Sequence, residues 1–237
     1  MTGGCGGSSV CRRLKRHRTH SAHRCRTGRA RATGRVCRWR SRLDEVTYRA
    51  QVPSVYHLCA EDFRGTTIYP LHRLRDEHPD IYELERPKWD GRESVLNFGV
   101  PHLGVTWGDT VNLAALDPVH LVAARRRLGV AYSRLLERRV VRIPVERLAG
   151  RDAVIYESRS HWLNSRPGQD VPATPPEEDF TRFDVSSYEE LTEVPQLHLD
   201  YLAQQKEAGE PALGFVFVRH VLVAGPVDIS GLTPTRL

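Results

Sequence analysis

Cysteine is scarce in this sequence, and its few copies are unevenly placed. Of the five cysteines, four precede residue 38 and only Cys59 lies beyond it. A region with one cysteine cannot build an internal disulfide framework, which excludes a disulfide-stabilised secreted domain. We therefore expect a reducing, cytoplasmic setting.

Long apolar runs and several common catalytic motifs are also absent. No run of about 18 apolar residues occurs, and the N-terminus lacks the apolar core of a secretory signal, so we expect no membrane partner. The sequence contains no GxSxG, GxxxxGK[ST], GxGxxG or HExxH motif. These absences remove support for α/β-hydrolase, P-loop, kinase and dinucleotide-fold interpretations, and we predict no metal site in the main body.

Acidic residues are missing from residues 1–43, which hold 12 arginines and one lysine. The rest of the chain has 22 basic and 29 acidic residues, a net charge of −7, although the whole chain has a net charge of +6. Residues 1–45 also show no apolar periodicity. We therefore predict a disordered arginine-rich tail over 1–45, followed by a single domain over 46–237.

Three interpretations of the tail remain open. A basic arm would bind nucleic-acid phosphates weakly and release counterions. Three histidines and a cysteine between residues 17 and 25 are close enough to converge on a metal ion, although they lack the spacings of known zinc modules. Alternatively, the stretch is translated from a misassigned start in GC-rich DNA, which the ratio of 32 arginines to three lysines favours.

The body alternates short apolar segments with turn residues. Strands are predicted over 52–59, 94–100, 105–116, 139–145, 153–156, 212–225 and 226–230. Helices are predicted over 117–129 and 195–209, and two short ones within 69–91, divided at Pro79. Residues 158–184 have little apolar periodicity and read as a long loop, a length that is usual for functional or mobile segments. Because the helices are grouped, we predict an α+β domain with a mixed or antiparallel sheet.

The first candidate site lies in the stretch SVYHLC, residues 54–59. In a strand, His57 and Cys59 share a face with Val55, whereas Tyr56 points to the other side. At a strand end, His57 could hydrogen-bond a sugar hydroxyl or serve as an acid or base, and Tyr56 could contact the ligand. The alternative is a buried histidine bonded to a backbone carbonyl, with Cys59 as a small core residue.

Two further clusters combine cations with aromatic or imidazole rings. Arg219 and His220 lie in the apolar run VFVRHVLV, which reads as an interior strand. A charged arginine is seldom buried without a partner, so Arg219 would face a structural carboxylate or an anionic ligand. In the long loop, Trp162 and Arg166 would suit a nucleotide or another planar anionic ligand. The alternative is that Trp162 only packs the loop against the domain.

Several motifs of the body resemble those of known families. The Tyr-His opening, IYPLHRL, WGDT and HVLVAG resemble a family of uncharacterised bacterial proteins. The strand that ends in Tyr-His, the middle strand VVRIPVERL and the closing strands also resemble ADP-ribosyltransferase-like domains, including DNA-modifying ones. That resemblance implies that His57 contacts the ribose and amide of NAD, the candidate cofactor, and that Glu157 after AVIY is the catalytic glutamate.

These features predict two different classes of function. The first is binding of a nucleotide-like ligand such as NAD, with ADP-ribosyltransferase-like transfer chemistry, in a cleft of His57, residues 158–168 and the C-terminal strand. The second is a non-enzymatic interaction module whose acidic body binds a protein partner. A ligand site requires His57 and Arg219 in one concave pocket, whereas an interaction module should expose an apolar patch on a flat face.

Deletion of residues 1–43 tests the interpretation of the tail. Because the tail contributes no apolar periodicity, its removal should change the midpoint of thermal unfolding by less than about 2 °C. The full chain should bind DNA weakly with a steep salt dependence, and the truncated chain should not bind it. A midpoint lowered by about 10 °C, or tight DNA binding by residues 44–237, would contradict this prediction.

Overall fold

The computed structural model describes residues 52–61, 63, 65–130, 138–158 and 175–237. The described residues all belong to the second of the two units into which the chain divides, residues 48–237. The arginine-rich tail and most of the predicted long loop therefore lie outside the described residues. Within the described part, no helix has the length and apolar character needed to cross a bilayer.

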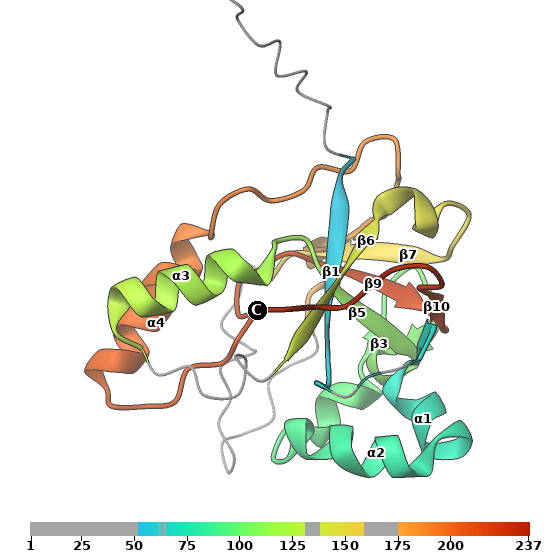
Figure 1. Ribbon diagram of the computed structural model, residues 1–237, viewed down its shortest axis with the longest axis horizontal. Helices are drawn as coiled ribbons and strands as arrows, with labels where there is room; N and C mark the ends of the chain where they lie inside the picture. Colours follow the sequence, from blue (N-terminus) through green and yellow to red (C-terminus); the bar gives the residue numbers. More distant parts are fainter. Residues whose placement is uncertain (1–51, 62, 64, 131–137, 159–174) are drawn as a thin grey trace, which may run out of the picture. The chain divides into compact units, whose positions relative to one another are not determined.

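Among the described residues, a seven-stranded antiparallel sheet forms the centre of the second unit (Figure 1). Its strands are, in sheet order, β11 (Thr235–Arg236), β6 (Arg139–Pro144), β1 (Ser54–Cys59), β5 (Thr110–Ala114), β9 (His220–Ala224), β7 (Ala153–Tyr156) and β8 (Phe180–Arg182). Two-stranded sheets pair β10 (Val227–Asp228) with β2 (Thr67–Ile68), and β3 (Gly99–Val100) with β4 (Val105–Thr106). Together with the helices, these sheets confirm the predicted α+β class.

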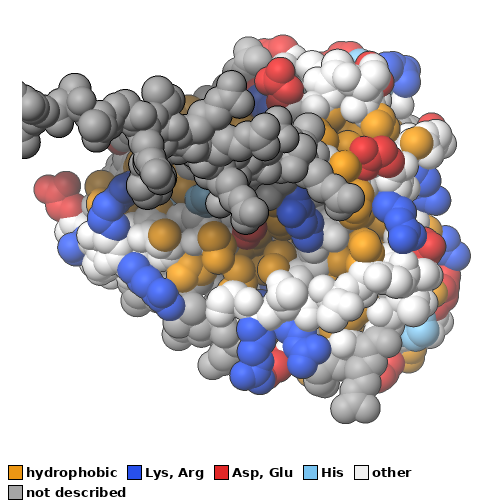
Figure 2. All heavy atoms as spheres, turned by 45° about the horizontal axis from the view of Figure 1, so that its top comes forward, with side chains coloured by type: hydrophobic (Ala, Val, Ile, Leu, Met, Phe, Trp, Pro, Cys, Tyr) orange, Lys and Arg blue, Asp and Glu red, His pale blue; other side chains and the backbone are white. Residues whose placement is uncertain are grey.

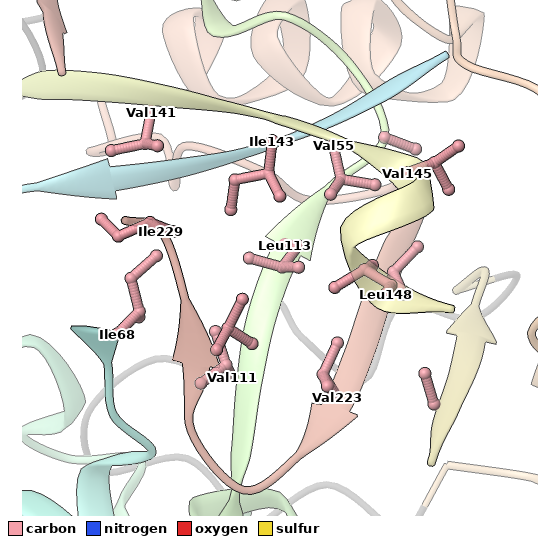
Figure 3. Packing of buried hydrophobic residues seen from close by; sticks show 14 of the residues in the cluster. Val55, Ile68, Val111, Leu113, Val141, Ile143, Val145, Leu148, Val223 and Ile229 are labelled. Carbon is pink, nitrogen blue, oxygen red and sulfur yellow. The ribbon is translucent and has the colours of Figure 1, made fainter. Parts of the chain in front are cut away.

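The two strands at the middle of this sheet, β1 and β5, are paired at one point. The register joins Tyr56 to Ala114 and no other residue of β1 to β5, whereas β1 pairs with β6 over its whole length. The sheet therefore has two parts, β11-β6-β1 and β5-β9-β7-β8, which meet at this pair. Figure 3 shows β1 and β5 running in different directions.

Residues 188–191 connect the two parts near the start of β1. The Tyr188 hydroxyl donates a hydrogen bond to the Ser54 carbonyl over 3.1 Å. The Leu191 amide donates to the Ala115 carbonyl over 2.8 Å. Residues 188–191 therefore fill the gap between β1 and β5 at the start of β1. The gap at the end of β1 is left open for a cavity.

The described α-helices form two groups (Figure 1). The first group is α1 (Leu71–Glu77) and α2 (Pro79–Glu85), and the second is α3 (Pro118–Leu128) and α4 (Gln196–Glu207), which lie side by side. The division at Pro79 is as predicted. The caps of α3 are also as predicted, since the Asp117 side chain accepts from the Val119 amide and Gly129 ends the helix with a φ of +65°.

Short 3-10 helices connect many of the remaining elements. They are η1 (Arg86–Trp89), η2 (Glu93–Asn97), η3 (Trp107–Asp109), η4 (Val145–Leu148) and η6 (Glu177–Asp179). Of these, η1 follows α2 directly, and η3 leads directly into β5. The helix η3 therefore brings Trp107 to the start of β5, near the point at which this strand separates from β1.

The main hydrophobic core lies on one face of the sheet (Figure 3). Val55 of β1 and Leu113 of β5 point into it, and Val145 and Leu148 of η4 close over it. The opposite face is covered by the segment that contains Trp107 and by residues 212–218. Both faces of the sheet are thus covered largely by short or irregular segments rather than by long helices.

Charges of both signs are mixed on the surface of this unit. Figure 2 shows one face that carries both Lys and Arg side chains and Asp and Glu side chains, with hydrophobic side chains among them. Ion pairs such as Arg73 with Glu77 at 2.6 Å and Arg86 with Asp90 at 3.3 Å follow the same pattern.

Two strand predictions are wrong over much of their length. Residues 94–100 form the end of η2 and only the two-residue strand β3. The neighbours Val95 and Leu96 are both buried, which a strand with one buried face does not allow. In the predicted strand 212–225, only residues from His220 onward are extended, because Phe217 adopts a φ of +59° and residues 215–218 form a turn.

A strand also occurs inside the predicted loop 158–184. Residues of β8 pair with β7 through Ile155 and Thr181, which extends the sheet at its edge. A three-residue strand carries too little alternation to be seen in a sequence. Similarly, the predicted strand 105–116 divides into β4, η3 and β5.

Replacement of Leu113 tests the central position of β5 in the core. Leu113 has 0% of its surface exposed, so Leu113→Ala should lower the free energy of unfolding by about 2–5 kcal/mol. The matched control is Leu197→Ala on α4, where the leucine is 53% exposed, and the expected change is within about 0.5 kcal/mol. Urea unfolding of both variants measures the difference, and equal losses would contradict this account of the core.

Candidate functional site

A cavity opens where β1 and β5 separate, and we name it the fork pocket. It has a volume of about 540 Å³, and most of its lining is apolar. Residues from the end of β1, the start of β5, α1, α2 and η1 surround it. Its aromatic walls are Phe63, Tyr69, Trp89 and Trp107. Ligand pockets typically measure about 300–1,000 Å³ and combine apolar walls with a few polar groups.

His57 is the polar group that β1 contributes to this pocket. Its Nδ1 lies 3.1 Å from the carbonyl oxygen of Asn112 on β5. Burial lowers the pKa of His57 to about 4, and the nearby charge of Lys88 acts in the same direction. The ring is therefore neutral at pH 7. Because a carbonyl only accepts, Nδ1 carries the proton and Nε2 remains a hydrogen-bond acceptor.

The neighbours of His57 alternate across β1 as predicted. Cys59 lines the fork pocket, and burial raises the pKa of its thiol to about 11, so it is not a thiolate at pH 7. Tyr56 lies on the other face and packs with Ala114. Its hydroxyl donates to Glu190, and burial together with Glu190 raises its pKa. Tyr56 does not line the fork pocket.

A cation and a carboxylate lie together in the wall of the fork pocket. Lys88 of η1 contacts the carboxylate of Glu85, which also pairs with Arg138 at 3.3 Å. Burial and the charge of Arg138 lower the pKa of Lys88, whereas the adjacent carboxylate favours the charged form. With its pKa lowered to about 7, Lys88 is about half protonated at pH 7, and it shares the one carboxylate of Glu85 with Arg138.

The packing of His72 against Gly108 fixes another wall of the pocket. The His72 Nδ1 lies 3.1 Å from Asp109 Oδ1, and Asp109 also accepts from the Thr106 amide over 3.0 Å. Burial raises the pKa of Asp109, but hydrogen bonds from Thr106 and His72 outweigh it and hold the pKa below its usual range. A Cβ on Gly108 would lie 2.4 Å from the His72 ring. Only glycine therefore allows α1 to approach η3 this closely.

A smaller cavity, which we name the second pocket, lies on the opposite face of the sheet from His57. It has a volume of about 240 Å³ and shares Trp89, Trp107 and Asn112 with the fork pocket. His220 lines it, and burial lowers the pKa of His220 to about 4 against the opposing effect of the Val218 backbone. His220 is therefore neutral at pH 7, like His57.

Arg219 and Glu157 form an ion pair away from both pockets. The Arg219 Nη2 lies 3.2 Å from Glu157 Oε1, and neither residue lines a described pocket. The structure thus does not bring His57 and Arg219 into one described pocket. Trp162 and Arg166 lie outside the described residues. Of the candidates, His57 and His220 line neighbouring pockets, and Tyr56, Arg219 and Glu157 line neither.

No protein-family model, curated protein or solved structure matches this chain. Function must therefore be inferred from the geometry of the two pockets.

The sequence analysis did not select Lys88, Trp89 or Arg92. They occur in RPKWDGR, residues 86–92, where two cations flank a tryptophan. Interleaved cationic and aromatic residues are a usable signal for an anionic planar ligand. Residues 86–91 fall in the stretch predicted as two short helices, and local periodicity gives no reason to single out their side chains.

The pH dependence of stability tests the neutral state of His57. Because the pKa of His57 is lowered from 6.5 to about 4 in the folded state, the unfolded chain binds a proton first as the pH falls. His57 therefore lowers stability progressively between about pH 6.5 and about pH 4, and adds no further loss below that range.

The variant His57→Gln should weaken this dependence. Between pH 7 and pH 5, wild type should lose about 1–2 kcal/mol more unfolding free energy than the variant. The control is His120→Gln, which replaces an exposed histidine on α3 and should follow wild type. Urea unfolding at the two pH values measures the effect, and parallel losses in all three proteins would contradict a half-buried, neutral His57.

Proposed function

We propose that this protein binds a nucleotide-like small molecule in the fork pocket, with NAD as the first candidate. The volume of about 540 Å³, the mostly apolar lining and the aromatic walls support a ligand that carries a planar ring. Lys88 at the same wall supports a ligand that also carries negative charge.

The observation that carries the proposal is the position of His57 in the gap between β1 and β5. Its bond to Asn112 holds the ring, and its neutral Nε2 is a fixed acceptor beside the cavity. Such an acceptor suits a sugar hydroxyl or a carboxamide N–H, both of which NAD offers. The resemblance to ADP-ribosyltransferase-like domains implies the same partners for His57.

Transfer of ADP-ribose is the chemistry that this resemblance implies for the same ligand. Such a transfer would break the bond between nicotinamide and ribose, so free nicotinamide is its product. Glu157 is held by Arg219 and does not line the fork pocket, so the geometry supports binding more strongly than transfer. Release of nicotinamide from bound NAD is the separate readout for the reaction.

One observation favours the alternative of an interaction module. On α2, Leu84 is 71% exposed and Ile81 is 40% exposed, and both contribute to the lining of the fork pocket. Exposed apolar side chains at a cavity can receive a partner's side chain. A protein partner and a small ligand would then compete for the same place.

Thermal unfolding with and without NAD tests the proposal. Wild type should gain stability as RT ln(1 + [L]/Kd), which raises the midpoint by about 5–10 °C at a concentration 100 times the Kd. His57→Ala should abolish this rise, because the fixed acceptor is lost. The free variant should lose no more than about 1–3 kcal/mol of unfolding free energy.

The control for this experiment is His120→Ala, which should keep the full response to NAD because the residue is exposed on α3 and lines neither described pocket. A wild type that ignores NAD at millimolar concentration, together with a strongly destabilised His57→Ala, would remove the ligand proposal. The interaction module would then be the remaining interpretation.

A further inference from the structure

Arg92 is a half-buried cation with no carboxylate partner among the described residues. Its Nη2 donates to the backbone carbonyl of Lys88 over 2.8 Å, and its guanidinium carbon lies 5.6 Å from the centre of the Trp89 ring. Burial lowers its pKa, Tyr201 acts in the opposite direction, and no carboxylate contributes. By contrast, Arg138 and Arg219 each have a glutamate partner. A partly desolvated arginine without a carboxylate partner can bind an anion that a ligand supplies.

The place of Arg92 links this cation to the proposed ligand site. Arg92 lines the second pocket, and Trp89 beside it lines both pockets. The wall between the pockets also contains Asn112, whose side-chain amide has no hydrogen-bond partner among the described residues. A group that passes from one cavity to the other would meet the Asn112 amide and the Arg92 guanidinium.

We infer that one ligand spans both pockets, and that Arg92 holds its anionic group in the second pocket. This inference rests on the ligand-binding function proposed for the fork pocket. It defines the ligand class as a molecule with a planar, hydrogen-bonding ring for the fork pocket and a phosphate-like anion for Arg92. The planar guanidinium suits a phosphate better than a lysine does, because it donates two parallel hydrogen bonds.

The rest of the second pocket indicates what accompanies the anion. Its remaining lining includes Tyr156, Phe215 and Val216, which would pack against a second ring. His220 adds a neutral imidazole rather than a charge. Lys88 is the weaker candidate for the anion, because Glu85 already contacts it. The two pockets together therefore favour a two-part ligand with the anion between or beside its rings.

Two variants of the second pocket test the inference with NAD as the probe. Arg92→Gln removes the cation, and Phe215→Trp keeps the cation but fills the cavity with a larger ring. Arg92→Gln should weaken NAD binding about ten- to hundred-fold, which is the usual effect of losing a hydrogen bond to a charged group. Phe215→Trp should also weaken it, because the larger ring takes the space of the ligand's second ring. The matched control is Arg86→Gln in the same short segment, since Arg86 pairs with Asp90 and lines neither described pocket. Isothermal titration gives the affinities, and the unfolding midpoint of each free variant reports on folding.

The outcomes separate this inference from the proposed function. If Arg92→Gln fails to fold, Phe215→Trp decides. NAD affinity that falls in both folded variants but not in Arg86→Gln supports the spanning ligand. Unchanged affinity in the folded variants overturns it, and the proposed function stands if His57→Ala still abolishes binding. A wild type that does not bind NAD overturns both.

Discussion

The single pairing of Tyr56 with Ala114 is the constraint on which the rest of this molecule depends. Because β1 and β5 meet only there, the backbone of β5 beyond this point has no strand on that side. His57 takes the place of the missing strand by donating to the Asn112 carbonyl. The same separation leaves a volume that α1, α2 and η1 enclose as the fork pocket. The His57 side chain thus both satisfies the Asn112 carbonyl and offers a candidate contact to a ligand.

In both pockets, the wall formed by the sheet is uncharged and the wall formed by residues 86–92 carries the cations. The sheet contributes neutral groups, because burial keeps His57 and His220 unprotonated at pH 7. The segment 86–92 contributes the cations, and only Arg92 among them lacks a carboxylate in the described residues. A ligand would therefore place uncharged hydrogen-bonding groups against the strands and its negative charge against this segment. That division of polarity is the main argument for a nucleotide-like molecule.

Contacts between segments far apart in the chain give two candidate residues partners that the sequence could not name. His57 was expected either at a site or in a bond to a backbone carbonyl, and it both bonds to a carbonyl and lines a pocket. Arg219 was expected to face a carboxylate or a ligand, and it pairs with Glu157, which lies 62 residues earlier. Periodicity describes which face a side chain occupies, but it does not say what lies opposite that face.

The sequence by itself determined the features that depend on neighbouring residues. Asp117 and Gly129 predict the ends of α3, and alternation predicts that His57 and Tyr56 lie on opposite faces of β1, because caps and strand faces are local properties of the chain. Only the tertiary structure decided the turn at Phe217, the gap between β1 and β5, and the meeting of Trp89 and Asn112. These features depend on which distant segments pack together. Local residue preferences do not encode such contacts, because the chain between the two segments can close the loop in many ways.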